Sequence, residues 1–118
     1  MDFQQLRRYC LSKPGAIEDF PFGDDTHVIK VGGKMFALLS EKEQIPHISL
    51  KGEPEFSELL RAQYDAVKPG YHLNKRHWNT VEMDGTLPEE EVKGWIDLSY
   101  QLVVKGLKKA VRDELFLL

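Results

Sequence analysis

One short stretch decides the fold: His27-Val-Ile-Lys-Val31, then Gly32-Gly33, then Lys34-Met-Phe-Ala-Leu-Leu39. Two runs rich in β-branched and other apolar residues are separated by two residues, which is the spacing of a tight β-hairpin. Paired glycines supply the positive φ angles that both central positions of a type I′ turn demand. The stretch therefore predicts two antiparallel strands joined by a two-residue turn.

The hairpin register predicts which side chains share a face of the sheet. The residues that flank the turn form a pair, and counting outward from that pair aligns the two strands. One side, which we expect to meet the helices, carries the pairs Ile29 with Phe36 and His27 with Leu38. The other side is too apolar to be freely solvated, so a helix, a loop or a partner is expected to shield it. Its members are Val28, Lys30, Met35, Ala37 and Leu39.

Helices and further strands are predicted on both sides of the hairpin by periodicity and by turn residues. In chain order we expect a helix at 2–12, an edge strand at 16–23, the hairpin, a strand at 45–51, a helix at 53–61, a strand at 78–83 and a final helix from Pro88. Thr86-Leu-Pro-Glu89 matches a capping box for that last helix. An unbroken helix to Phe116 would be about 43 Å long, so we expect a break near Gly106. The fold class is α+β, a two-layer sandwich with the N- and C-terminal helices packed on one face of an antiparallel sheet.

Length and composition set limits on the function. A chain of 118 residues with 42% hydrophobic and 30% charged residues predicts one globular domain, residues 1–118. The formal net charge of −3 weighs against attraction of the whole surface to a polyanion. The single cysteine, Cys10, lies on one stripe of the first helix, where we expect it to pack as a small hydrophobe. No stretch is apolar enough to span a bilayer, so we expect a cytoplasmic protein, and a monomer.

The segment Pro69-Gly-Tyr-His-Leu-Asn-Lys-Arg-His-Trp-Asn-Thr-Val81 is locally cationic and aromatic and contains no acid. Lysine and arginine can neutralise phosphates, asparagine can bond to a base edge or a phosphate, and an exposed tryptophan can stack on a base. The residues expected to contact nucleic acid are Lys51, His72, Asn74, Lys75, Arg76, His77 and Trp78. Lys30 and Lys34, on the glycine hairpin, are expected to form a second contact, as a protruding wing that enters a groove.

Motifs along nearly the whole chain resemble the MmcQ/YjbR family, and Asn74-Lys75-x-His77-Trp78 is the most specific of them. The others are Lys13-Pro14-Gly15, Pro21-Phe22-Gly23, Val28-x-Lys30-Val31, Lys34-x-Phe36-Ala37, Ile48-Ser-Leu50-Lys51, Pro69 to Lys75, Thr80-Val81, Asp84-Gly85 and Ser99-Tyr100. The resemblance implies a fold like that of the frataxin homologue CyaY. It also implies DNA binding through a double-wing arrangement, and it brings no catalytic activity and no cofactor.

Other interpretations of the same residues stay open. Trp78 can belong to the core, while the histidines cap strand ends and the cations are merely solvated. The chain can instead be a binding module for a small anion or a protein partner, which the net negative charge and the apolar second face of the hairpin favour. Zinc requires three or four convergent ligands, and no recognised ligand spacing is present. No nucleophile motif or phosphate-binding loop appears either, so we expect neither a metal site nor an enzyme.

Overall fold

The computed structural model describes residues 1–70 and 73–116. These residues form four helices, α1 (Phe3–Leu11), α2 (Pro54–Gln63), α3 (Glu89–Lys105) and α4 (Lys109–Phe116). They also form six strands, β1 (Ile17–Asp19), β2 (His27–Val31), β3 (Lys34–Lys42), β4 (Ile45–Lys51), β5 (Val67–Pro69) and β6 (Trp78–Glu82). The predicted elements are all present, and the short strand β5 is an addition.

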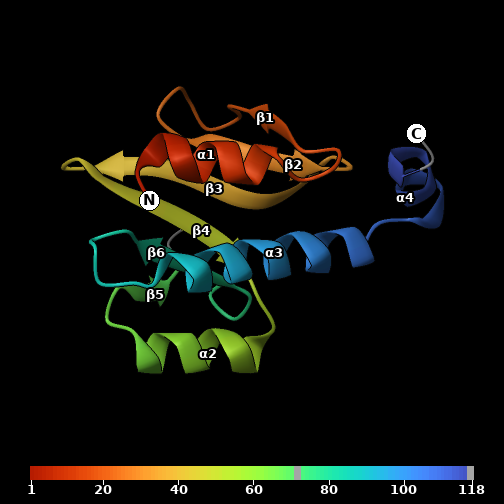
Figure 1. The fold of residues 1–118 in the computed structure, drawn as a ribbon. Coiled ribbons are helices and arrows are strands. Elements are labelled where there is room, and N and C mark those ends of the chain that lie inside the picture. Colours follow the sequence, from red (N-terminus) through yellow and green to blue (C-terminus); the bar gives the residue numbers. More distant parts are fainter. Residues whose placement is uncertain (71–72, 117–118) are drawn as a thin grey trace.

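The strands form one antiparallel sheet in the order β1-β2-β3-β4-β6-β5. Helices α1 and α3 pack against the central strands, and α2 packs against β5 and β6. All three cover the same side of the sheet (Figure 1). The α+β class, with an antiparallel sheet and helices on one face, is therefore confirmed.

The glycine hairpin forms as predicted, but its register differs. Gly32 and Gly33 have φ of +58° and +81°, the left-handed angles of a type I′ turn. Ile29 pairs with Ala37 rather than with Phe36, because Phe36 is an extra residue opposite the step from Ile29 to Lys30. Such a β-bulge shifts every later pair of the hairpin by one residue. The predicted pairs of Ile29 with Phe36 and of His27 with Leu38 are wrong for this reason.

The bulge also corrects the assignment of the two faces. Ala37 and Leu39 project toward the helices and are fully buried in the core, whereas Leu38 projects from the opposite side. Val28, which pairs with Leu38, is fully buried on that opposite side. The expected apolar second face is thus partly core and partly shielded by the chain itself. The argument for a protein partner at this face is removed.

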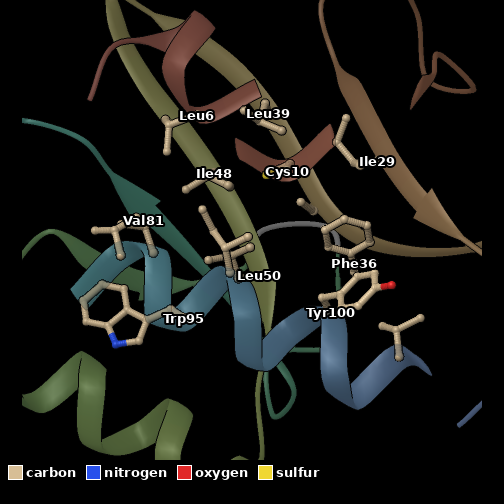
Figure 2. Packing of buried hydrophobic residues seen from close by; sticks show 14 of the residues in the cluster. Leu6, Cys10, Ile29, Phe36, Leu39, Ile48, Leu50, Val81, Trp95 and Tyr100 are labelled. Carbon is tan, nitrogen blue, oxygen red and sulfur yellow. The ribbon is translucent and has the colours of Figure 1, made fainter. Parts of the chain in front are cut away.

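The core lies between the sheet and the helices (Figure 2). The ring of Phe36 packs edge to face on Tyr100 of α3, with the ring centroids 5.2 Å apart. The ring of Trp95, also on α3, packs in the same way on Tyr64, with centroids 5.4 Å apart. Both are favoured aromatic geometries. Cys10 is fully buried in this cluster, which confirms its predicted role as a packed hydrophobe.

The C-terminal helical region breaks at Gly106, as predicted, because α3 ends at Lys105 and α4 begins at Lys109. The predicted capping box is wrong. Pro88 occupies the N-cap without a side-chain hydrogen bond, and the Thr86 hydroxyl instead donates to Asp84 Oδ1 at 2.6 Å. Among the described residues, none of the helices combines the length and the apolar character that a bilayer span requires.

Candidate functional site

Trp78, the predicted stacking residue, is a buried side chain with 8% of its surface exposed. It opens β6 opposite Lys51 of β4, and Gly70 approaches it so closely that a Cβ added there would lie 3.0 Å from Trp78 Cβ. The exposed fraction shows that the protein covers the Trp78 side chain. The interpretation of Trp78 as a packed residue holds, and base stacking on it is not available in this conformation.

The segment just before β6 holds the other predicted contact residues. Lys75 and Arg76 are exposed, whereas Asn74 shapes the turn. Its side-chain oxygen accepts from the Arg76 N–H at 3.0 Å, and its carbonyl accepts from the N–H groups of His77 and Trp78 at 3.1 and 2.9 Å. Asn74 is thus engaged in holding the loop. The predicted contact residue His72 lies outside the described residues.

The sheet brings several of the predicted cations to one end. Strand β3 begins at Lys34, β4 ends at Lys51, and β6 begins just after Lys75 and Arg76. Because these strands are antiparallel neighbours, the three positions share one end of the sheet, which we call the basic end. Lys30 is set apart, since its Nζ forms an ion pair with Asp19 Oδ2 at 2.9 Å.

The side of the sheet that carries no helix, the open face, is hollowed by a pocket of about 420 Å³. Its floor consists of two rows of side chains that cross the strands. The first row is Leu38, Ser49, Thr80 and Lys68, and the second is Ser40, His47 and Glu82. Ligand pockets in proteins typically measure 300–1,000 Å³. The open-face pocket therefore has the size of a site for a small molecule.

The walls of the open-face pocket come from two connections and one strand end. Phe22 and Thr26 belong to the loop between β1 and β2, Leu73 to the connection between β5 and β6, and Lys42 to the end of β3. Phe22 is 63% exposed. A second, shallower hollow adjoins the pocket at Thr26 and Lys42, and its lining includes exposed acids.

Hydrogen bonds fix the polar groups of the floor. The hydroxyls of Ser49 and Thr80 bond to each other at 2.8 Å. His47 Nδ1 lies 2.9 Å from the carbonyl oxygen of Ile45, and a carbonyl can only accept, so Nδ1 carries a proton. In the neutral ring, Nε2 is therefore the acceptor.

Charges in the open-face pocket are partly compensated. Lys68 Nζ lies 2.6 Å from Glu82 Oε1. Lys42 has no carboxylate at ion-pair distance within residues 1–70 and 73–116. With neutral histidine, the pocket lining thus keeps one positive charge that no carboxylate of the lining neutralises. In the same described residues, no group of three or more His, Cys, Asp or Glu side chains converges as a metal site.

Sequence reasoning missed the open-face pocket. The alternation of His47, Ser49 and Lys51 between apolar residues indicates that these side chains leave the core. What the chain alone does not reveal is that β4 pairs with β6, which sets Thr80 beside Ser49 and Glu82 beside His47.

Comparison with known proteins agrees with the sequence motifs. The family model YjbR matches residues 11–102. The chain belongs to the YjbR family. It is 42% identical over 112 residues to "Uncharacterized protein YjbR" of Escherichia coli strain K12, covering 95% of each chain. It is 41% identical over 118 residues to "Uncharacterized protein YbdF" of Escherichia coli O157:H7, covering 97% of this chain and 95% of that one.

Two solved structures share the fold. The crystal structure of Deinococcus radiodurans protein DR2400, a DUF419 domain, superposes with a TM-score of 0.86 at 43% identity and covers 98% of this chain and 88% of its own. A crystal structure from Pseudomonas syringae superposes with a TM-score of 0.75 at 31% identity, over 87% and 99%. The names of these relatives state no activity, so the function has to be argued from the site.

Proposed function

We propose that this YjbR-family chain is a binding protein for a small anionic ligand, which it holds in the open-face pocket. The observation that carries the proposal is the pocket itself, a hollow of about 420 Å³ on the helix-free side of the sheet, with polar groups from four neighbouring strands on its floor. A concave site with apolar walls and a few convergent polar groups is the usual form of a small-molecule site.

The charge of the pocket favours an anion. Lys68 is paired with Glu82, so Lys42 contributes the charge that a ligand can neutralise. Because one of the Ser49 and Thr80 hydroxyls donates to the other, the second hydroxyl keeps a proton that it can donate to an acid group. An anion gains from each of these contacts because charge-assisted hydrogen bonds are stronger than neutral ones.

The proposal is binding without catalysis. The Cys10 thiol is buried, and its burial raises its pKa to about 12, so it supplies no thiolate at neutral pH. Ser40 and His47 face each other across β3 and β4, but no hydrogen bond joins their side chains among the described residues. An activated serine nucleophile requires that bond.

Binding can be tested by titrating the ¹⁵N-labelled protein with phosphate, citrate and benzoate while following backbone amide shifts. We expect at least one anion to shift amides of Ser40, Ser49 and Thr80 and to raise the thermal midpoint, since a ligand selective for the folded form stabilises it. Lys42→Met should abolish the effect and Lys75→Met, at the basic end, should leave it intact. Equal loss in both variants, or shifts confined to the basic end, would contradict the proposal.

A second candidate function is contact with DNA, and one observation favours it. The sheet gathers Lys34, Lys51, Lys75 and Arg76 at the basic end, although the net charge of the chain is −3. With Trp78 buried, such contact would rest on phosphates rather than on stacked bases.

Fluorescence anisotropy with duplex DNA at about 50 and 200 mM salt tests this candidate, because phosphate contacts weaken steeply with salt. Lys75→Ala with Arg76→Ala should reduce binding, while Lys42→Met should not. Absence of binding at the lower salt concentration rules the candidate out. The likeness to CyaY, the cytoplasmic location and the monomeric state stay predictions, and neither proposal depends on them.

A further inference from the structure

We infer that the ligand of the open-face pocket is a small aromatic monoacid that carries a hydrogen-bond donor on its ring. The inference rests on the proposed function and specifies the chemical class of its ligand. Three features of the described lining lead to it: an exposed aromatic wall, a lysine with no carboxylate at ion-pair distance, and a histidine whose Nε2 is an acceptor when the ring is neutral.

The walls favour a planar group. Phe22 lines the pocket and is 63% exposed overall, and Leu73 lies on a different connection of the chain. Leu38 provides an apolar patch of floor on β3, beside Ser49 of β4. An exposed phenyl ring at a pocket binds an aromatic ligand ring more strongly than an aliphatic group. The reason is that two stacked or edge-to-face rings attract each other beyond the burial of their apolar surface. A planar body over Leu38 and against Phe22 uses apolar surface of both the floor and a wall of the pocket.

The charge of the lining limits the ligand to one acid group. Lys42 is the cation of the lining that has no carboxylate at ion-pair distance within the described residues, and Glu82 already holds Lys68 at 2.6 Å. A second anionic group would approach Glu82 without a free cation to offset it, and like charges at close range repel. Phosphate esters and polycarboxylates are therefore disfavoured against a monocarboxylate.

The donor on the ring is required by His47. Its Nδ1 is committed to the carbonyl of Ile45 at 2.9 Å, so the neutral ring turns Nε2 outward as an acceptor. Glu82, paired opposite His47 on β6, is a second acceptor. A ligand hydroxyl or amino group can donate to one of these acceptors, whereas an ether at the same position can donate to neither.

A matched set of probes tests each feature separately by amide-shift titration of the full chain. The reference probe is 4-hydroxybenzoate. Its comparisons are 4-hydroxybenzamide, which lacks the charge, 4-methoxybenzoate, which lacks the donor, and 4-hydroxycyclohexanecarboxylate, which lacks the planar ring. We expect 4-hydroxybenzoate to shift Leu38, Ser40 and Thr80, and each comparison to bind about fivefold more weakly or worse, the factor expected when one hydrogen bond or ring contact is lost.

Two pairs of variants locate the effects on named residues. Phe22→Ala should weaken 4-hydroxybenzoate about fivefold and leave the cyclohexane acid unchanged. Phe116→Ala, the same substitution at another exposed ring, should leave the affinities for both acids unchanged. His47→Asn keeps an amide able to donate to Ile45 and removes Nε2. The ratio of affinities between 4-hydroxybenzoate and 4-methoxybenzoate should then fall, as expected when His47, one of the two acceptors near the hydroxyl, is lost.

The outcomes separate this inference from the proposed function. If the cyclohexane acid, phosphate or citrate binds at the open face as tightly as 4-hydroxybenzoate, the aromatic monoacid is wrong and the anion site stands. If 4-methoxybenzoate and 4-hydroxybenzoate bind equally in the parent chain, the ring donor is wrong. If none of the anions shifts open-face amides, the proposed function fails and the inference fails with it.

Discussion

The Ser99 hydroxyl of α3 donates a 2.6 Å hydrogen bond to the backbone carbonyl of Phe36, the extra residue of the β3 bulge. The same oxygen accepts from the N–H of Lys51 at 2.9 Å. One fully buried serine thus serves backbone groups on two neighbouring strands. It bonds to the bulge that sets the register in which Leu38 and Ser40 face the open side of the sheet.

Replacing Ser99 should therefore destabilise the fold. Ser99→Ala leaves the Phe36 carbonyl and the Lys51 N–H without this partner, and we expect a loss of about 1–3 kcal/mol in the free energy of unfolding, measured in urea. Ser40→Ala is the control. Ser40 is half-buried in the open-face pocket, so its loss should stay within about 0.5 kcal/mol. Equal stability of the two variants would show that the bulge does not depend on Ser99.

The same bulge explains where prediction from the sequence succeeded and failed. The glycine turn and the positions of the two hairpin strands follow from local rules, and both are confirmed. The assignment of side chains to the two faces of the sheet did not follow from local rules. An extra residue at Phe36 reverses the inward and outward alternation of the side chains beyond it. Nothing local marks that residue, and the serine that bonds to its carbonyl lies 63 positions away in the chain.

The candidate site depends even more on contacts that are distant in sequence. The open-face pocket joins Ser49 to Thr80 and His47 to Glu82 only because β6 inserts between β4 and β5. Strand β5 was not predicted, because Val67-Lys-Pro69 is three residues long and contains a proline. Trp78 shows a second reason why the site could not be predicted. The composition of its segment indicates a cationic surface, but it does not indicate that the fold buries this side chain.

Packing of α4 against the hairpin turn gives a matched pair of glycine variants. A Cβ added at Gly32 would lie 2.7 Å from Leu107 Cδ1 and 3.1 Å from Val111 Cγ1, whereas one added at Gly33 meets nothing within 4 Å. Both residues have positive φ, so alanine strains the backbone at both positions. Gly32→Ala should be the more destabilising of the two by about 1 kcal/mol or more, as measured by urea unfolding. If the two variants have the same free energy of unfolding, the side chains of Leu107 and Val111 move aside at little cost to accommodate the added methyl group.

Cys10 provides a test of core rigidity. Its thiol is fully buried, and burial raises its pKa to about 12, so neither exposure nor ionisation favours reaction. At pH 8 an aromatic disulfide reagent should label the folded protein only at the rate of opening, and should label it rapidly in urea. Fast labelling without denaturant would show that α1 leaves the sheet readily.

Acid stability should depend on Glu18, which links α1 to the edge of the sheet. Arg7 donates to both of its carboxylate oxygens, at 2.7 and 2.8 Å, and His27 Nδ1 lies 3.0 Å from one of them. The hydrogen bond from Arg7 is the largest cause that lowers the pKa of Glu18 from 4.5 to about 2. Because the folded-state pKa lies below the unfolded one, the stabilisation is complete above pH 4.5 and is lost as the pH falls toward 2.

The variant Glu18→Gln measures this contribution. At pH 7 it should unfold at a lower urea concentration than the parent, and the gap should narrow steadily between pH 5 and pH 2.5, because the parent carboxylate becomes protonated over that range. Glu90→Gln is the control, since Glu90 is largely exposed and meets Lys93 only at 3.6 Å; it should match the parent at every pH. A gap for Glu18→Gln that is as wide at pH 2.5 as at pH 7 would place its effect in packing rather than in charge.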